Sequence, residues 1–519
     1  MGDLLLGLDI GTSSSKAVVA RPDGSVVATV SAAHETSLPR PGWVEHDAER
    51  VWWADVLTLL AELGGETLSR VAGVCVSGIG PCLLPVDAAG NPLRPAILYG
   101  VDTRATAEIE ELTARYGAAS ILAVGGSPLT SQAVGPKLLW LRRNEPEVWA
   151  STRRFLMASS YAVLRLTGDY VLDHHSASQC NPLYDLAGAR WRDDWAEEIA
   201  PGLELPRLLW PGEAAGAVTA AAAAETGIPA GTPVAAGTID AWAEALGAGV
   251  VAPGDTMLAY GTTMFVVHVA PGASPDPALW LTAGVAPGSR TVAAGMATSG
   301  ALTSWLRELA GGVPYEQLLA EAEATPPGAD ALVVLPYFAG ERTPLFDPDA
   351  RGAFLGLALR HGRGHLYRAL LEATGFGVRH NLEAIERAGG EPRRLVAVGG
   401  GTRGALWTQI VSDITGREQD VPASTIGASY GDAQLAGAAA GLVPLAAGWT
   451  HVAETVRPRP EPRATYDALY DVYRRLYPAT LELAHVLAEL QRATASPVEA
   501  ALGQAAQTEK PTEPRRSAR

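Results

Sequence analysis

The sequence is poor in cysteine, and it has no long apolar run and no cluster of basic residues. Its three cysteines, Cys75, Cys82 and Cys180, are too few for a disulfide framework and lack the spacing of a zinc site. No apolar stretch reaches membrane-spanning length, and the first residues lack the basic start of a signal peptide. We therefore expect a cytoplasmic protein with reduced core thiols and no membrane partner.

The charge balance argues against a nucleic-acid partner. Lys and Arg number 40 against 56 Asp and Glu, which gives a net charge of −16. An acidic chain without a basic run binds nucleic acid poorly. A P-loop with its phosphate-binding lysine is also missing, which argues against the P-loop kinases. With 47% hydrophobic and 18% charged residues, the 519-residue chain is expected to be globular, with two or three domains.

One stretch near the N-terminus, residues 4–20, predicts a strand, a tight turn and a second strand. Leu4–Ile10 is nearly all apolar, as in a strand buried on both faces, and the turn that follows is small and hydroxyl-rich. Asp9 lies at the end of the strand, beside the N–H and O–H donors of the turn. This pattern favours a phosphate in the turn and a Mg²⁺ ion at the acid, because Mg²⁺ needs few protein carboxylates. An exposed acid on an ordinary hairpin is the alternative.

A second stretch, residues 256–269, repeats this outline half a chain later, and its Gly261 aligns with Gly11. Two such hairpins indicate a duplicated domain, with both turns facing a shared cleft that grips the phosphates of one nucleotide. The second copy has Ala259 in place of Asp9. The two halves are therefore expected to be alike in structure and unequal in chemistry.

A single carboxylate, Asp240, lies at the junction of the two halves. A buried strand ends at Gly237, and Asp240 starts a helix that leads into the second half. An acid at a helix start is usually a cap. Phosphoryl transfer to a hydroxyl also needs a positioned carboxylate that accepts the proton, and Asp240 is the candidate for this general base.

Three further segments follow predicted strands, where α/β proteins place ligands. One is the Gly/Pro corner 78–82, and the second is Asp102 with Arg104, just before a predicted helix. Asp102 has two interpretations, a partner for substrate hydroxyls or a helix cap. The third segment is the glycine run 399–401 between a strand and a helix, where backbone can approach a flat ring or a phosphate closely.

Five motifs in order resemble the FGGY carbohydrate kinases of the actin-like ATPase superfamily. The motifs are residues 7–12, residues 237–240 with 247–249, residues 260–263, residues 352–357 running to Glu372, and residues 399–401. The resemblance implies an α/β protein in which two ribonuclease-H-like (actin-like ATPase) domains flank a central cleft. The expected bounds are 1–246 for the N-terminal domain and 247–488 for the C-terminal domain. Residues 489–519 have almost no large apolar groups and predict a disordered tail.

The resemblance also implies a reaction, the ATP-dependent transfer of the γ-phosphate to a sugar hydroxyl, with Mg²⁺ as the metal. Asp240 is implied as the general base, and Asp9 as the residue that orients magnesium through water. The residues implied to hold the phosphates are Gly11, Thr12, Ser13, Gly261, Thr262 and Thr263. Gly400 and Gly401 are implied at the adenosine, and Gly80, Pro81, Asp102, Arg104 and Asp240 at the sugar.

Within the family, the chain resembles the xylulokinase branch most, through residues 42–45 and 102–104. It departs at residues 80–82, Gly-Pro-Cys, where xylulokinases commonly show Met-His-Gly. Loss of that histidine removes a partner for a sugar hydroxyl, so another ketopentose, a polyol or a deoxy-sugar is an alternative to D-xylulose. Two rival functions stay open, a glycerol-type polyol kinase and an actin-like ATPase switch without a sugar acceptor. A homodimer is one of the oligomeric states that the sequence leaves open.

Overall fold

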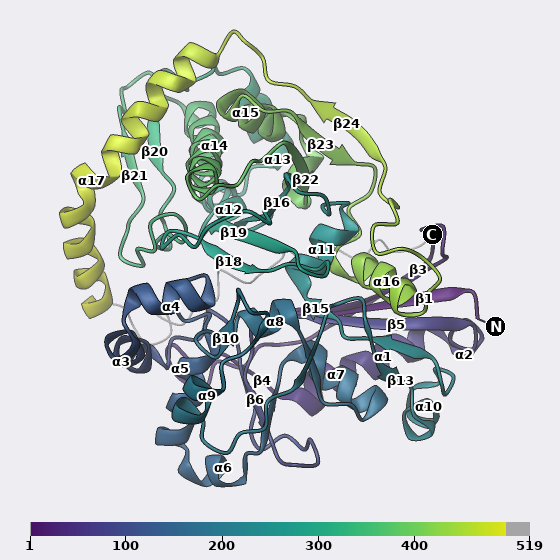
Figure 1. The fold of residues 1–519 in the computed structure, drawn as a ribbon. Helices are drawn as coiled ribbons and strands as arrows, with labels where there is room; N and C mark the ends of the chain where they lie inside the picture. Colours follow the sequence, from purple (N-terminus) through teal and green to yellow (C-terminus); the bar gives the residue numbers. More distant parts are fainter. Residues whose placement is uncertain (1, 495–519) are drawn as a thin grey trace.

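The structure, a computed structural model, describes residues 2–494 and contains two seven-stranded sheets (Figure 1). The first sheet has the order β13-β14-β5-β1-β2-β3, and β15 lies beside β5. Its strands are β1 (Leu4–Ile10), β2 (Ser14–Ala20), β3 (Val26–Ala33), β5 (Val71–Gly78), β13 (Ala214–Ala217), β14 (Pro233–Ala235) and β15 (Thr238–Ile239). The predicted strand–turn–strand at the N-terminus is confirmed.

The second sheet repeats the core of the first. Its order is β18-β19-β17-β16-β22-β23-β24. The strands are β16 (Asp255–Tyr260), β17 (Met264–Val269), β18 (Trp280–Ala283), β19 (Arg290–Met296), β22 (Arg394–Val398), β23 (Gln419–Pro422) and β24 (Val452–Val456). In both sheets an antiparallel run of three strands begins with the strand before the turn, which also pairs with a parallel strand on its other side. The predicted duplication is confirmed by this shared topology.

Strand β1 is buried on both faces, as its apolar run predicts. Leu4, Leu6 and Leu8 pack into one core with side chains of α1 (Ala54–Leu63) and α7 (Ala158–Thr167). On the other face, the helix α16 (Ala428–Ala439) lies directly on the strand. A Cβ atom at Gly7 would be 1.9 Å from the carbonyl oxygen of Ser429, so only glycine permits this approach.

Helix α16 comes from the C-terminal part of the sequence, and yet it packs on the first sheet (Figure 1). It also packs closely on α11 (Asp240–Gly247), because a Cβ atom at Gly431 would be 1.9 Å from the carbonyl oxygen of Ala243. The expected domain boundary at residue 247 therefore divides the sequence, but a helix from beyond it packs on the sheet of the N-terminal domain.

A mostly helical segment separates β5 from β13 in the sequence. Its elements include α3 (Thr106–Tyr116), α4 (Ala118–Gly125), α5 (Val134–Asn144), α6 (Pro146–Ser151), β8 (Arg154–Leu156), β9 (Val171–Asp173), α8 (His174–Ser178), α9 (Asp193–Ile199) and β12 (Arg207–Leu209). The π-helix Ala48–Trp53 leads into α1, and α10 (Ala220–Thr226) follows β13. Short strands β6 (Leu84–Val86) and β7 (Ala96–Ile97) precede α3.

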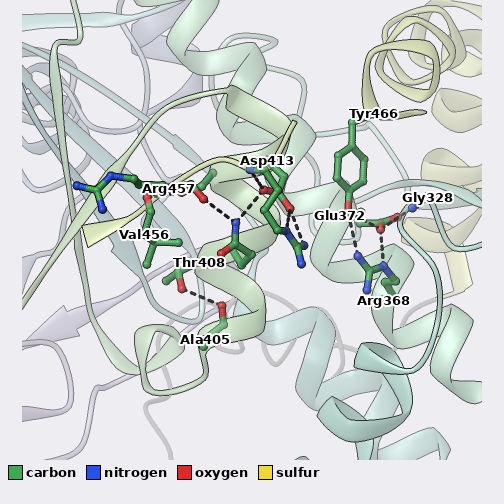
Figure 2. Close-up of polar contacts among 12 residues, drawn as sticks. Gly328, Arg368, Glu372, Ala405, Thr408, Asp413, Val456, Arg457 and Tyr466 are labelled. Atoms are coloured by element: carbon green, nitrogen blue, oxygen red, sulfur yellow. Dashed lines mark hydrogen bonds and ion pairs between the residues drawn. The ribbon is translucent and has the colours of Figure 1, made fainter. Parts of the chain in front are cut away.

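In the second half, helices cover the sheet around the long helix α14 (Arg363–Arg387). The others are α12 (Gly300–Leu309), α13 (Tyr315–Glu323), α15 (Ala405–Thr415) and α17 (Arg463–Thr494), with the strands β20 (Val333–Leu335) and β21 (Ala353–Leu355). Figure 2 shows Glu372 of α14 accepting hydrogen bonds from Arg368, from Tyr466 of α17 and from the backbone of Gly328. Glu372, at the end of the fourth motif, thus joins helices inside this half.

Helix α17 continues through residue 489, the expected start of the tail, and ends at Thr494. Its last turns carry Leu483, Val486, Leu487 and Leu490 at helical spacing, which extends the helical pattern beyond the predicted boundary. The remainder of the predicted tail lies outside the described residues. Among the helices of residues 2–494, none combines the length and the apolar character needed to cross a bilayer.

Candidate active site at the seam of the two halves

Three parallel strands of the first sheet end at one edge, and this edge carries both predicted carboxylates. The register places Asp9 of β1 beside Ser77 of β5, and Ser77 beside Thr238 of β15. Helix α11 begins at Asp240, directly after β15. The carboxyl ends of parallel strands are where α/β folds bind ligands. Asp9 and Asp240 are therefore brought to the same edge from positions far apart in the sequence.

Asp240 does not occupy the capping position of its helix. The N-cap residue is Ile239, and the Asp240 carboxylate accepts a 2.7 Å hydrogen bond from the backbone of the next residue, Ala241. The register of β15 and the start of α11 fix its backbone. This position is less consistent with a simple helix cap and leaves the role of a base available.

The first turn is tightly held by its neighbours. The N–H of Gly11 donates to the carbonyl of Ser14 at 3.1 Å, and a Cβ at Gly11 would be 2.5 Å from that same oxygen. The hydroxyl of Thr12 lies 3.1 Å from that of Tyr99, and the carbonyl of Thr12 accepts a 2.7 Å bond from Thr36. The hydroxyl-rich turn is thus fixed in one conformation beside a half-buried tyrosine.

The charge of Asp240 also acts on Tyr99. Burial raises the pKa of Tyr99, the hydrogen bond with Thr12 lowers it, and the negative charge of Asp240 raises it further. Thr12 and Asp240 therefore act on the same phenol, one by a hydrogen bond and the other through its charge.

The second turn is held at the start of α12. The N–H groups of Ser299 and Gly300 donate to the carbonyls of Thr262 and Gly261 at 3.0 and 2.9 Å. Within the turn, the N–H of Gly261 donates to the carbonyl of Thr263, two residues on, at 3.1 Å, whereas Gly11 in the first turn donates to Ser14, three residues on. The two predicted turns thus occupy corresponding places in the two sheets but close with different backbone hydrogen bonds. Phosphate contacts of Gly11, Thr12, Ser13, Gly261, Thr262 and Thr263 stay predictions.

The glycine run 399–401 lies beside the second turn, because β22 pairs in parallel with β16. Gly399 has φ of +92°, and a Cβ there would be 2.7 Å from the carbonyl oxygen of Tyr260. A Cβ at Gly401 would be 2.8 Å from both Trp407 and Tyr260, whereas one at Gly400 would meet no atom within 4 Å. Internal packing therefore accounts for glycine at 399 and 401, and Gly400 has the open face that an adenosine contact needs.

The structure places a second carboxylate, Asp432, near Asp9, which the sequence analysis does not identify. Asp432 of α16 is fully buried and accepts hydrogen bonds from Ser77 Oγ at 2.6 Å and from Cys75 Sγ at 3.6 Å. Burial raises its pKa well above the ordinary value, and the charge of Asp9 adds to this rise. The available signal was a single acid in a helix that is otherwise rich in alanine and glycine.

The donor set at this edge fits magnesium. Among residues 2–494 no three His, Cys, Asp or Glu side chains form a cluster that would hold a metal ion by themselves. Mg²⁺ is usually bound by one or two carboxylates together with water and phosphate oxygens. Asp9, beside a turn suited to phosphates, offers this arrangement.

Gly80, one of the predicted sugar-side residues, packs against the residue that precedes the candidate base. A Cβ at Gly80 would be 2.7 Å from the side chain of Ile239, the residue before Asp240. Burial raises the pKa of Cys82, two residues on, to about 12, and the charge of Asp240 also acts on this thiol. The corner formed by Gly80 and Pro81 is therefore adjacent to the start of α11.

Asp102 and Arg104 form an internal ion pair. Asp102 is 1% exposed and accepts bonds of 2.7 Å from the backbone of Val44 and from Arg104 Nη2. Arg104 also pairs with Glu45 at 2.8 Å. Asp102 does not cap α3, whose N-cap is Ala105, so the helix-cap alternative is wrong. A contact of Asp102 or Arg104 with a sugar stays a prediction.

The sequence analysis also does not single out Lys137, a cation among the apolar residues of the first two turns of α5. Its side chain is 1% exposed, and Nζ has no hydrogen-bond partner among the described residues. Burial lowers its pKa to about 8, against the opposing charge of Asp102 and the Cys82 thiol. The segment before α5 is joined to the loop of Asp102, because Ser131 Oγ donates to the carbonyl of Gly100 at 2.7 Å.

Comparison with known proteins agrees with this geometry. Residues 4–247 match the N-terminal domain of the FGGY family of carbohydrate kinases, and residues 256–440 match its C-terminal domain. Xylulose kinase of Escherichia coli K12 is 30% identical over 501 residues, which cover 92% of this chain and 100% of that protein.

Solved structures show the same relationship. The crystal structure of xylulose kinase from Rhodospirillum rubrum has a TM-score of 0.87 at 36% identity, covering 93% of this chain and 100% of that one. Glycerol kinase from Plasmodium falciparum has a TM-score of 0.82 at 20% identity over 91% of this chain and 97% of that one, which is a likeness of fold. Kinases of this family use ATP and phosphorylate small sugars. Two actin-like ATPase domains, matched along most of their length, show that this chain belongs to the FGGY family of carbohydrate kinases and is an ATP-dependent sugar kinase.

Proposed function

We propose that the substrate is a ketopentose, D-xylulose or a sugar close to it. The names of the relatives at 30% identity and above support this class. The glycerol alternative rests on a likeness of fold at 20% identity and is weaker. Because residues 80–82 lack the histidine expected in xylulokinases, the hydroxyl pattern that is preferred can differ from that of D-xylulose.

We propose Asp240 as the general base. It accepts the proton of the attacking hydroxyl, and the hydroxyl oxygen then forms a bond to the γ-phosphorus as the bond to the leaving ADP oxygen breaks. The observation that carries this proposal is the common sheet edge that holds Asp9 and Asp240, with Thr12 reached through Tyr99. Closure of the two halves would exclude water, which otherwise competes with the sugar as acceptor.

For the nucleotide, we propose that the two turns hold the phosphates and that Gly400 and Gly401 lie at the adenosine. Asp9 would hold Mg²⁺, which supplies positive charge to the phosphate oxygens when it is bound. Each turn follows the first strand of the antiparallel run in its sheet, and this shared position supports equivalent roles on the two sides of one nucleotide.

On the sugar side, we propose that Lys137 donates a hydrogen bond to a sugar oxygen. A buried ammonium group without a partner is costly, and a bound ligand or water usually satisfies such a group. The charge of Lys137 acts on Cys82, on which the charge of Asp240 also acts, so both groups influence the 80–82 corner. Lys137 then offers the polar contact that the missing histidine does not.

The test is an ADP-release assay over D-xylulose, D-ribulose, xylitol, glycerol and several aldoses, with Asp240→Asn alongside. Release stimulated most by a ketopentose, and lost in Asp240→Asn, would support the proposal. Stimulation by glycerol or xylitol alone would replace the ketopentose with a polyol. ADP release that no acceptor changes would overturn the proposed substrate class and return the ATPase switch as an explanation.

A further inference from the structure

The second half carries an arginine on a loop fixed beside the second turn. Two hydrogen bonds join this loop to Gly295, near the end of β19. The N–H of Thr343 donates to the carbonyl of Gly295 at 3.2 Å, and the N–H of Gly295 donates to Thr343 Oγ at 2.6 Å. Strand β19 pairs with β17, the strand that leaves the second turn. Arg342 is therefore mounted on rigid backbone next to that turn.

The guanidinium of Arg342 makes no hydrogen bond or ion pair within residues 2–494, and the charge of Glu341 acts on it only at longer range. The residue is nevertheless partly buried. The adjacent Glu341 accepts bonds from the backbone N–H groups of Ala297 and Arg342 at 2.8 and 2.7 Å. Burial raises the pKa of Glu341 to about 8, so this acid is mostly neutral at pH 7. A partly desolvated cation without a counter-charge in hydrogen-bond contact favours an anionic ligand.

The positive charge of Arg342 acts on a residue of the first half, Tyr99. It lowers the pKa of that phenol, whose hydroxyl lies 3.1 Å from that of Thr12. Asp240 acts on the same phenol with the opposite sign. The Arg342 side chain of one half is thus near enough to Tyr99 of the other half for its charge to act on that phenol.

We propose that Arg342 is a catalytic residue that binds the phosphoryl group as it passes from ATP to the sugar. The proposal rests on the proposed roles of Thr12 and Asp240. During transfer the sugar oxygen bonds to the γ-phosphorus, the bond to the bridging oxygen breaks with its electron pair left on ADP, and the proton goes to Asp240. Arg342 donates N–H groups to the non-bridging oxygens, where negative charge is spread in the transition state.

The test compares Arg342→Met and Arg342→Lys with the full-length wild-type chain in steady-state ADP release. We expect Arg342→Met to lower kcat about 100-fold with little change in the KM of the sugar, and Arg342→Lys to lose less. Arg342→Ala should regain part of its turnover in guanidinium chloride at concentrations that do not unfold it. Arg360→Met, which removes an exposed arginine far along the same segment, should keep wild-type rates.

A second measurement does not depend on the sugar. The wild type should bind a non-hydrolysable ATP analogue more tightly than Arg342→Met does, whereas ADP should bind both equally, which also shows that the variant is folded. Equal kcat values in Arg342→Met and wild type, or a rise in sugar KM alone, would overturn the proposal. If wild-type ADP release ignored every sugar, the substrate proposal would fail, and the analogue-to-ADP affinity ratio would still decide the role of Arg342.

Discussion

Ser77 donates a 2.6 Å hydrogen bond to Asp432, a residue 355 positions later in the chain. The contact fixes helix α16 on the first sheet at the strand position beside Asp9. Both side chains are fully buried, so neither has water as an alternative partner. The bond therefore joins the C-terminal part of the sequence to the edge that carries the candidate base.

We expect Asp432→Ala to lower the free energy of unfolding by about 1–3 kcal/mol, because the Ser77 hydroxyl loses its acceptor inside the core. Asp432→Asn keeps an acceptor oxygen and should lose less. A double-mutant cycle with Ser77→Ala, measured by urea denaturation, isolates the coupling between the two side chains. Asp471→Ala, on the exposed side of α17, serves as the control. Strictly additive effects would contradict the coupling.

Asp240→Asn should lower kcat by about 10²–10⁴-fold and change the KM of ATP little, because the amide cannot accept the proton of the sugar hydroxyl. Asp193→Asn is a matched control, since Asp193 also begins a helix, α9, on the surface. Steady-state ADP release with the best acceptor measures both variants. Near-normal turnover in Asp240→Asn would remove the proposed base.

Removal of divalent cations with EDTA should abolish ADP release, and added Mg²⁺ should restore it. Asp9→Asn should need a higher Mg²⁺ concentration for half-maximal rate, because the amide oxygen carries no charge. Asp23→Asn changes another hairpin acid, one that bonds to Ser25 on the surface, and should keep the wild-type Mg²⁺ dependence. An unchanged Mg²⁺ dependence in Asp9→Asn would exclude Asp9 as the magnesium residue.

Glu341 predicts a pH effect on stability. Its ordinary pKa is 4.5, and burial raises the pKa in the folded protein to about 8. Between these values the folded state binds a proton that the unfolded state has released, so this residue makes folding less favourable as pH rises. Glu341→Gln removes this pH-dependent loss of folding free energy, because glutamine does not ionise. The variant should therefore gain about 2–4 kcal/mol relative to wild type between pH 5 and pH 8.

Urea midpoints of wild type and Glu341→Gln at pH 5 and pH 8 measure this difference. The glutamine oxygen can still accept from the N–H groups of Ala297 and Arg342, so the loop should keep its conformation. A difference between the two proteins that is the same at both pH values would show that Glu341 ionises normally in the folded state.

The sequence by itself determined the elements that depend on neighbouring residues. The apolar run Leu4–Ile10, the three-residue turns after it and after Tyr260, and the start of a helix at Asp240 all follow from local periodicity and turn chemistry. The repeat of one pattern half a chain later was sufficient to indicate the duplicated fold. These features also carried the resemblance to the FGGY family.

Tertiary structure alone decided which side chains meet. The alanine- and glycine-rich stretch of α16 predicts close packing but not that it lies on β1 and brings Asp432 to Ser77. Likewise, nothing near Arg104 in the sequence indicates its pairing with Glu45, and nothing near Arg342 points to Tyr99. Such contacts join residues far apart in the chain, and their free energies depend on burial and distance, which local spacing does not encode.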